Sequence, residues 1–409
     1  MRLSARARPG RLRFLISTVC LSGLLVGLVS CAPPPAVPKL ELQPAGFERL
    51  EGWGADDPSG ALLAFRRSCT ALRSRAASDP MSTEPAFGQV REWLPACVAA
   101  DAQASLVSAA AARAFFETWF QPYRVSDAGK PVGLFTGYYE PVLHGSRHAA
   151  GPYQVPLHAA PPDLLRIDLA RFDPKLAGYT IWGRLAEGEL VPYYSRAEID
   201  QGALAGRDLE LLWVDDPIAK FFLQVQGSGQ VRLDDGSVVR VGYAAQNGRP
   251  YRAIGRDLIE LGALPPDRVT LQTIRAWLRA HPGDAAGIME RNPSYIFFNE
   301  HSELAADDGP LGSQGVPLTA GRSLAIDRRF LPLGAPVWLD TSAPRPDRPD
   351  TEAPLRRLLI AQDTGGAIKG VVRGDVFWGA GEPAEAIAGR MQSRGRYAVL
   401  LPKAVVPTS

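Results

Sequence analysis

Apolar side chains recur at helical spacing in three segments of the first 120 residues. The first segment begins at Ser59 and carries its apolar residues on one face, at steps of three and four. The second is centred on Trp93 and Cys97, one helical turn apart, and the third is the alanine-rich stretch 108–120. We expect the aromatic residues of these helices to pack in the core rather than to bind a ligand. The apolar positions that define the first helix are Leu62, Phe65, Cys69 and Leu72.

From about residue 132 the spacing becomes that of β-strands. Residues 136–141 (TGYYEP) are typical of a strand that breaks at a proline. Valines and a leucine alternate on both sides of the turn 234–236, which predicts a hairpin. We interpret residues 221–226 as a further strand that enters a Gly/Ser turn. On a strand, Gln224 and Gln226 would point to the same face.

The rest of the chain is expected to contain a further helix and more strands. Thr270 is expected to cap a helix that ends before Pro282, and residues 310–402 are interpreted as strand and turn throughout. Residues 344–354, rich in proline and charge, predict a surface loop. A chain of 409 residues with 46% hydrophobic content can bury a large core. The pattern therefore indicates a β-rich protein of two domains, or of one domain with an insertion.

The charged residues bear on two questions, the class of partner and the role of the N-terminus. The net charge of +2, without a basic stripe interleaved with aromatic residues, argues against a nucleic-acid partner. Arginines precede the apolar run 14–29, which is short for a membrane span of about 20 residues, and Cys31 follows where cleavage is expected. We predict a lipoprotein signal peptide at 1–30, with Cys31 lipidated, rather than a transmembrane anchor. The proline-rich stretch 31–50 is then expected to be an extended tether.

The cysteines agree with an exported protein. Cys20 lies in the signal segment and Cys31 is the lipidation site, which leaves Cys69 and Cys97. An even pair in an oxidising compartment predicts a disulfide, with two separate buried thiols as the alternative. Closing a loop of about 28 residues would contribute on the order of 3 kcal/mol.

Candidate chemistry is concentrated in the stretch 358–377 (LLIAQDTGGAIKGVVRGDVF). An apolar strand reaches Asp363, a Gly-Gly turn follows, and Asp375 lies within the next strand-like segment. Carboxylates beside glycines suit acid/base chemistry, because glycine permits close approach of backbone and substrate. The structural alternative is that Asp363 caps the turn and Asp375 is a solvated strand residue.

Other classes of site have no support in the sequence. The five histidines lack a metal-binding spacing, and we expect neither a metal nor a cofactor. The segment 226–230 begins like a Gly-x-Ser-x-Gly nucleophile elbow but has Gln where the last glycine should stand. Phosphate-binding loop signatures are absent from the sequence. Acid catalysis by carboxylates remains.

Several long motifs in order carry a family resemblance over roughly residues 130–402. The stretch DTGGAIKG followed by Asp375, with LAIDRRFLPLGAPVWL upstream, resembles the three-aspartate module of the MltA-type lytic murein transglycosylases. The similarity continues through GLFTGYYEP (133–141), LLWVDDPIAKFFLQVQGSG (211–229) and NPSYIFFNE (292–300). Residues 45–130 and the loop 344–354 have no counterpart that we can align.

The resemblance implies a mainly β, α+β fold. A double-psi β-barrel with N-terminal helices would be built from residues 51–141 and 291–403. A second small β-domain, residues 142–290, would be inserted in it, and residues 310–402 would form the three-aspartate catalytic module.

It also implies a reaction. Lytic transglycosylases cleave the β-1,4 bond between N-acetylmuramic acid and N-acetylglucosamine of peptidoglycan and leave a 1,6-anhydromuramoyl end. Asp375 would be the acid and then the base, Asp363 would support it, and Asp327 would stabilise the barrel. Lys369 would bind the substrate's carboxylate or lactyl group, or pair with Asp363, and these roles stay open. The other expected substrate-binding residues are Thr136, Tyr138, Glu140, Gln224, Gln226 and Ser228; core or surface roles are the alternative for them.

The expected product of this gene is thus a peptidoglycan lytic exotransglycosylase, held by its lipid at the outer membrane and facing the periplasm. Glycan strands would be its partner, and other cell-wall enzymes are candidate partners. Two readings compete. One is a glycoside hydrolase that uses two carboxylates, and the other is a non-catalytic lipoprotein that tethers the wall to the membrane.

Overall fold

The computed structural model describes residues 38–103, 107–176, 179–302, 304 and 308–407. The expected signal peptide and Cys31 lie outside these residues. Within them, no helix combines the length and apolar character that a membrane span needs. The expected tether is wrong from Leu40 onward, because β1 (Leu40–Pro44) pairs antiparallel with β2 (Phe120–Asp127) and so belongs to the folded part.

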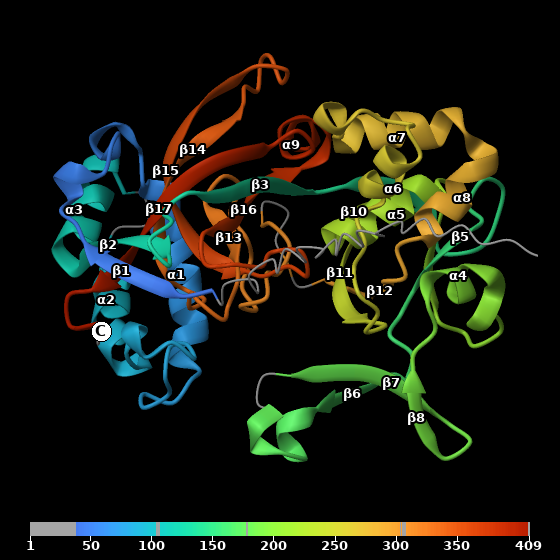
Figure 1. Ribbon diagram of the computed structural model, residues 1–409, viewed down its shortest axis with the longest axis horizontal. Coiled ribbons are helices and arrows are strands. Elements are labelled where there is room, and N and C mark those ends of the chain that lie inside the picture. Colours follow the sequence, from blue (N-terminus) through green and yellow to red (C-terminus); the bar gives the residue numbers. More distant parts are fainter. Residues whose placement is uncertain (1–37, 104–106, 177–178, 303, 305–307, 408–409) are drawn as a thin grey trace, which may run out of the picture. The chain divides into compact units, whose positions relative to one another are not determined.

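Six strands close into a barrel (Figure 1). The larger sheet has the order β1-β2-β17-β14-β15-β13-β16-β3, and β3 also pairs with β17. This additional pairing joins the two ends of the run from β17 to β3, while β1 and β2 extend the sheet beyond the barrel. The barrel strands are β3 (Gly133–Glu140), β13 (Ser323–Ile326), β14 (Pro336–Pro344), β15 (Glu352–Asp363), β16 (Arg373–Ala380) and β17 (Gln392–Pro402).

The barrel core explains why the apolar run before Asp363 is uninterrupted. All four side chains from Leu358 to Ala361 are fully buried, as expected of a strand enclosed on both faces. The predicted surface loop lies at the tip of the β14–β15 hairpin, where residues 345–351 connect the two strands.

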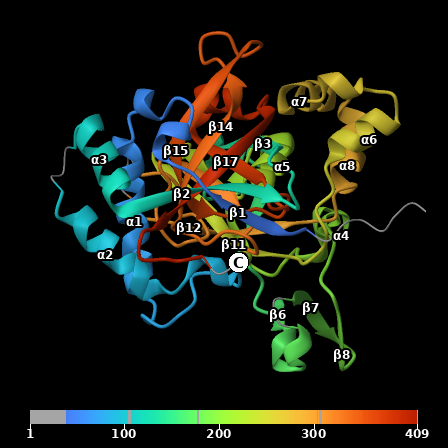
Figure 2. The same cartoon turned by 60° about the vertical axis from the view of Figure 1, so that its left-hand side comes forward.

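The three helices predicted from the N-terminal pattern are confirmed. They are α1 (Ser59–Arg73), α2 (Val90–Asp101) and α3 (Ala109–Trp119), and they pack against the barrel core (Figure 2). Ser108 caps α3 by accepting a hydrogen bond from the backbone N–H of Ala111. Cys69 of α1 and Cys97 of α2 form a disulfide with an S–S distance of 2.07 Å.

A second sheet is built from the chain between the barrel strands. Its order is β12-β11-β10-β4-β9-β5, and it includes the predicted hairpin as β10 and β11. Its last strand ends at Glu300, ten residues beyond the expected boundary at residue 290. The strands are β4 (Val142–Ser146), β5 (Val155–His158), β9 (Glu210–Val214), β10 (Ser228–Leu233), β11 (Val238–Gln246) and β12 (Ile296–Glu300).

Helices and a small third sheet accompany these strands. The third sheet consists of β6 (Leu165–Asp168), β7 (Thr180–Ala186) and β8 (Glu189–Pro192). Thr270 caps α7 as expected, by accepting a hydrogen bond from the Thr273 N–H. The helices are α4 (Arg196–Glu198), α5 (Pro217–Gln226), α6 (Ile254–Glu260), α7 (Leu271–Ala280) and α8 (Pro282–Glu290).

Two sequence predictions about elements are wrong. The segment 221–226 is not a strand but the second half of α5. Asp216 caps this helix, Pro217 occupies its first turn, and Gly227 ends it with a left-handed φ of 85°. Residues 310–402 are not strand and turn throughout, because α9 (Gly381–Ala388) lies between β16 and β17. The described chain is a mixed α+β structure that is mostly β.

Candidate active site

Two paired strands bring Asp375 and Thr136 together. β16 runs parallel to β3 with Asp375 opposite Thr136, and antiparallel to β13 with Asp375 opposite Ala325. Thr136 Oγ1 donates a hydrogen bond to Asp375 Oδ1 over 2.6 Å. Arg373, two residues earlier on β16, donates from Nη2 to the same threonine oxygen over 2.9 Å. No described residue places a donor within hydrogen-bonding distance of Asp375 Oδ2.

The environment of Asp375 favours its protonated form. Burial raises the pKa of this carboxyl from 3.8 to about 6, because the charged form loses solvation. The Arg373 guanidinium and the Thr136 hydrogen bond lower the pKa, whereas the nearby Asp363 carboxylate raises it. The side chain is half-buried, so it is desolvated and still accessible. Such a carboxyl can donate a proton at a pH near neutrality.

Asp363 is held more firmly than Asp375. Its Oδ1 accepts hydrogen bonds from the Ser313 N–H over 2.8 Å, the Ser313 hydroxyl over 2.7 Å and the Thr364 N–H over 2.8 Å. Its Oδ2 accepts from the Tyr138 hydroxyl over 2.9 Å. Burial raises the pKa of Asp363, and these hydrogen bonds offset that rise only in part. The four donors make Asp363 suited to orientation and electrostatic support rather than to proton transfer.

Tyr138 connects Asp363 to the barrel wall. Its ring packs against Phe377, with 5.3 Å between the ring centroids. Burial and the Asp363 carboxylate raise the pKa of the Tyr138 hydroxyl well above its usual value, so the hydroxyl remains a donor. Asp375 also contributes to this shift, which indicates that both carboxylates lie near the tyrosine.

Sequence reasoning missed Arg373 and Ser313. Arg373 had a usable signal, because a residue two positions before Asp375 on a strand faces the same side. Ser313 had none, since it lies outside any strand and reaches Asp363 only through the fold.

Asp327 and Lys369 lie in different surroundings. Asp327 is 4% exposed and accepts hydrogen bonds from Arg329 and from the Gly370 N–H. Burial raises its pKa, but these hydrogen bonds outweigh burial and the net pKa is lowered, so its charge serves contacts within the barrel. Lys369 is exposed, and no ion pair joins it to Asp363 among the described residues.

Two expected substrate-binding residues are buried in internal contacts, which corrects the prediction. Glu140, 1% exposed, pairs with Arg240 at 3.1 Å and accepts a hydrogen bond from Gln230. Gln224 is buried, donates to the Ile296 carbonyl over 3.0 Å and accepts from Arg196.

Gln226 and Ser228 are partly accessible. Gln226 accepts a hydrogen bond from the Tyr139 N–H over 3.0 Å, and Ser228 is half-buried at the start of β10. Because α5 is a helix, residues two positions apart point about 200° apart around its axis, so Gln224 and Gln226 do not share a face.

Comparison with known proteins assigns the family. The MltA specific insert domain matches residues 134–299 and the 3D domain matches residues 322–401. A crystal structure of a membrane-bound lytic murein transglycosylase from Agrobacterium tumefaciens is 34% identical, covering 89% of this chain and 98% of that chain with a TM-score of 0.77. This chain belongs to the MltA family.

Other MltA proteins extend the comparison. The membrane-bound lytic murein transglycosylase A of Vibrio cholerae is 33% identical over 265 residues, which are 64% of this chain and 64% of that protein. The chain thus matches a little under two thirds of the length of that curated relative. A crystal structure of Escherichia coli MltA with bound chitohexaose is 26% identical, covers 89% of this chain and 94% of that chain, and has a TM-score of 0.61.

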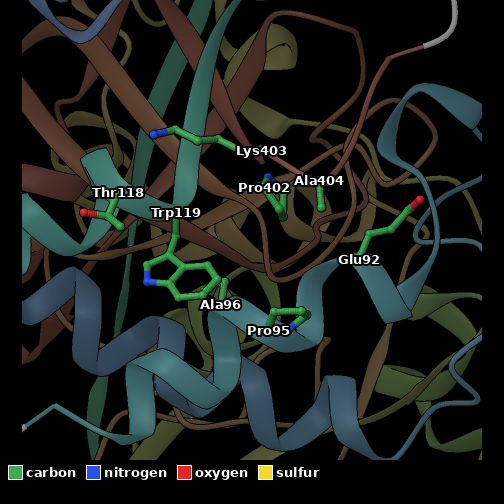
Figure 3. Close-up of a pocket in the computed structure, with 8 residues that line it drawn as sticks. All are labelled: Glu92, Pro95, Ala96, Thr118, Trp119, Pro402, Lys403 and Ala404. Carbon is green, nitrogen blue, oxygen red and sulfur yellow. The ribbon is translucent and has the colours of Figure 1, made fainter.

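A metal site and a small cavity are the other kinds of site to consider in this MltA-family chain. No group of three or more metal-binding side chains gathers among the described residues. A cavity of about 200 Å³ lies where α2, the end of α3 and the residues after β17 meet (Figure 3). Its two charged residues are engaged elsewhere. Glu92 accepts a hydrogen bond from the Gln89 N–H, and Lys403 donates to the Glu117 carbonyl.

Proposed function

We propose that this chain is a peptidoglycan lytic transglycosylase in which Asp375 is the acid and base. One observation carries the proposal. In a chain of the MltA family, a half-buried carboxyl with a pKa raised to about 6 has one oxygen fixed by Thr136, and no described residue donates to the other. This combination supports proton donation to a substrate oxygen.

The reaction needs no enzyme nucleophile. Asp375 protonates the oxygen of the β-1,4 bond between N-acetylmuramic acid and N-acetylglucosamine, and the bond from muramoyl C1 to that oxygen breaks. The muramoyl C6 hydroxyl attacks C1 and gives its proton to the Asp375 carboxylate. A 1,6-anhydromuramoyl end results, and the acid is regenerated. Because the attack is intramolecular, proximity supplies part of the acceleration.

The remaining site residues support these steps. Asp363, fixed by four donors, places negative charge near the oxocarbenium character that develops at C1. We assign Tyr138, Thr136, Gln226 and Ser228 to the groove that receives the glycan. We assign Lys369, which is exposed beside the Gly-Gly turn, to binding of a substrate carboxylate.

The same proposal includes the organisation of the chain. The closed barrel is proposed to have double-psi topology, and the six-stranded sheet with its helices to form a domain inserted in it. Residues 310–402 form the catalytic module. Lipidation at Cys31 would hold the enzyme at the outer membrane, facing the periplasm, with glycan strands and other cell-wall enzymes as partners.

Mass analysis of muropeptides released from purified sacculi tests this proposal. We expect residues 32–409 to release anhydromuramoyl products, and Asp375→Asn to lower the rate at least about a hundredfold, because general acid catalysis typically contributes that much. Asp350→Asn is the matched control, since Asp350 is exposed at the hairpin tip and its side chain is 91% accessible.

Each contrary outcome would indicate a different function or mechanism for this protein. Reducing ends in place of anhydro ends would mean hydrolysis, with Asp363 or Asp327 as the second carboxylate. Binding to sacculi without release by either form would mean a tether. Equal release by wild type and Asp375→Asn would remove Asp375 from the chemistry.

A further inference from the structure

Three side chains on two neighbouring strands form a chain of hydrogen bonds that ends at Asp375. Arg373 donates from Nη2 to Thr136 Oγ1 over 2.9 Å, and Thr136 Oγ1 donates to Asp375 Oδ1 over 2.6 Å. The other terminal nitrogen of Arg373, Nη1, donates to the carbonyls of Leu134 and Gly374 and so anchors the guanidinium to both strands. The guanidinium is therefore fixed in orientation.

The direction of these bonds follows from the chemistry of the groups. A guanidinium has donors and no acceptor, so Thr136 must accept from Arg373. The hydroxyl has a single proton, and with one lone pair occupied by Arg373 that proton is directed to the remaining neighbour, Asp375 Oδ1. In a protonated carboxyl the carbonyl oxygen is the better acceptor. Oδ1 is then the carbonyl oxygen, and the acid proton lies on Oδ2.

We propose that Arg373 is a positioning residue that acts through Thr136 to assign the acid proton to Asp375 Oδ2. Oδ2 is the oxygen without a donor among the described residues, so it is the one available to a glycosidic oxygen. The inference rests on the proposed function, in which Asp375 is the acid. It adds a residue that touches neither the substrate nor the carboxylate by a hydrogen bond of its own.

Arg373 has two effects that experiment can separate. Its charge lowers the pKa of Asp375, while the Asp363 carboxylate raises it and Tyr138 remains a neutral hydroxyl. Burial lowers the pKa of Arg373 itself, and the Asp375 carboxylate opposes this. The Arg373 charge and the Thr136 hydrogen bond both make the Asp375 proton easier to lose. The fixed donor geometry sets which oxygen holds it.

The test compares Arg373→Gln with Arg373→Lys. Gln removes the charge, so the pKa of Asp375 should rise and the alkaline limb of kcat/KM should move to higher pH. Lys keeps a positive charge but lacks the planar fork that reaches Thr136 and the two carbonyls together. We expect the limb of Arg373→Lys to stay at the wild-type position while kcat falls about tenfold. Arg394→Gln, exposed on β17, is the control and should change neither.

Substitutions at Thr136 test the middle of the chain of bonds. Thr136→Ser retains the hydroxyl and should keep kcat within about twofold, whereas Thr136→Val should lower it about tenfold or more. Wild-type kcat in Arg373→Lys, or in a folded Thr136→Val, overturns the proposal. An alkaline limb of kcat/KM that moves equally in Arg373→Gln and Arg373→Lys also overturns the proposal. If Arg373→Gln does not fold, the Thr136 pair and Arg373→Lys still decide.

A carboxyl titration keeps this test separate from the proposed function. The ¹³C signal of the Asp375 carboxyl, assigned by its loss in Asp375→Asn, can be followed with pH without substrate. We expect its pKa to rise in Arg373→Gln and in Thr136→Val and to stay unchanged in Arg373→Lys. If the pKa of Asp375 is the same in all of these variants and in wild type, the inference is overturned. Normal shifts in a protein that releases nothing from sacculi would contradict the proposed function alone.

Discussion

Asp375 combines a catalytic requirement with a cost in stability. A carboxyl that is to give up a proton near neutrality must be desolvated, and desolvation makes its charged form unfavourable in the folded chain. The pKa of about 6 expresses that cost, because it lies above the ordinary value of 3.8. Arg373 and Thr136 offset burial only in part.

This cost predicts how stability depends on pH. Between about pH 4 and 6 the folded chain holds a proton on Asp375 that the unfolded chain has released, so stability falls as pH rises through this window. Asparagine does not ionise. We expect Asp375→Asn to be more stable than wild type above about pH 7, on the order of 1 kcal/mol after allowing for the solvent contact of the side chain.

Thermal unfolding across this range is the measurement. The gain of Asp375→Asn over wild type should shrink as the pH is lowered and vanish near about pH 4. Asp350→Asn should show no such dependence, because Asp350 is exposed. A gain that is constant across the range would mean that ionisation of Asp375 is not its source.

At the scale of single elements, local signals predicted well and distant contacts were not readable. Helices α1 to α3 and the β10–β11 hairpin followed from apolar spacing and turns, because the information lies within a few residues. α5 was missed because its β-prone run FFLQVQ outweighed the capping signal at Asp216-Pro217. Glu140 was misassigned because its partner Arg240 comes from a strand a hundred residues later.

The pairing of α1 with α2 leads to a prediction about stability. The disulfide joins two buried positions and closes a loop of 28 residues. We expect its reduction to lower the free energy of unfolding by about 3 kcal/mol, through the added freedom of the unfolded chain. Urea unfolding with and without a reductant measures this difference. The free energy of unfolding of the Cys69→Ser, Cys97→Ser variant should equal that of the reduced protein and should not change when the reductant is added.

A second contact between elements joins α7 to α9. Arg275 of α7 pairs with Glu385 of α9, and Glu385 also accepts a hydrogen bond from the Tyr139 hydroxyl over 2.9 Å. A backbone hydrogen bond joins the same two segments, because the Leu271 N–H donates to the Gly389 carbonyl over 3.1 Å. α7 is thereby bonded to the segment between the barrel strands β16 and β17.

Arg275→Ala should therefore cost more than loss of a surface charge. Arg275 also donates from Nη2 to the hydroxyl of the buried Tyr139 over 3.3 Å, so the variant removes a partner from both Tyr139 and Glu385. We expect a loss of about 1–2 kcal/mol in urea unfolding. Arg279→Ala, one turn later and 62% exposed, should change the free energy by less than about 0.5 kcal/mol. Equal losses in the two variants would show that the contact adds nothing beyond ordinary surface pairing.

At the scale of the whole molecule, the motifs predicted the family and the barrel strands but not the way they close. The family matches, residues 134–299 and 322–401, leave out the three N-terminal helices. Those helices contribute Phe65, Trp93 and Phe116 to the same buried cluster as barrel residues Val337 and Leu359. Apolar spacing predicts that a helix has a buried face, but it does not say which sheet covers that face. The barrel therefore depends on a region that no motif marks.

The closure of the barrel also sets an order of assembly. β3 pairs with β16 and with β17, the last strand of the described chain, whereas every strand of the six-stranded sheet has been made by Glu300. In a chain that emerges N-terminus first, β3 can form these pairings only after β16 and β17 have been synthesised. Pairings between segments so distant in sequence form slowly. Thr136 and Asp375 meet across that late seam. A chain that stops before β17 therefore cannot close the barrel in which Thr136 and Asp375 lie opposite each other.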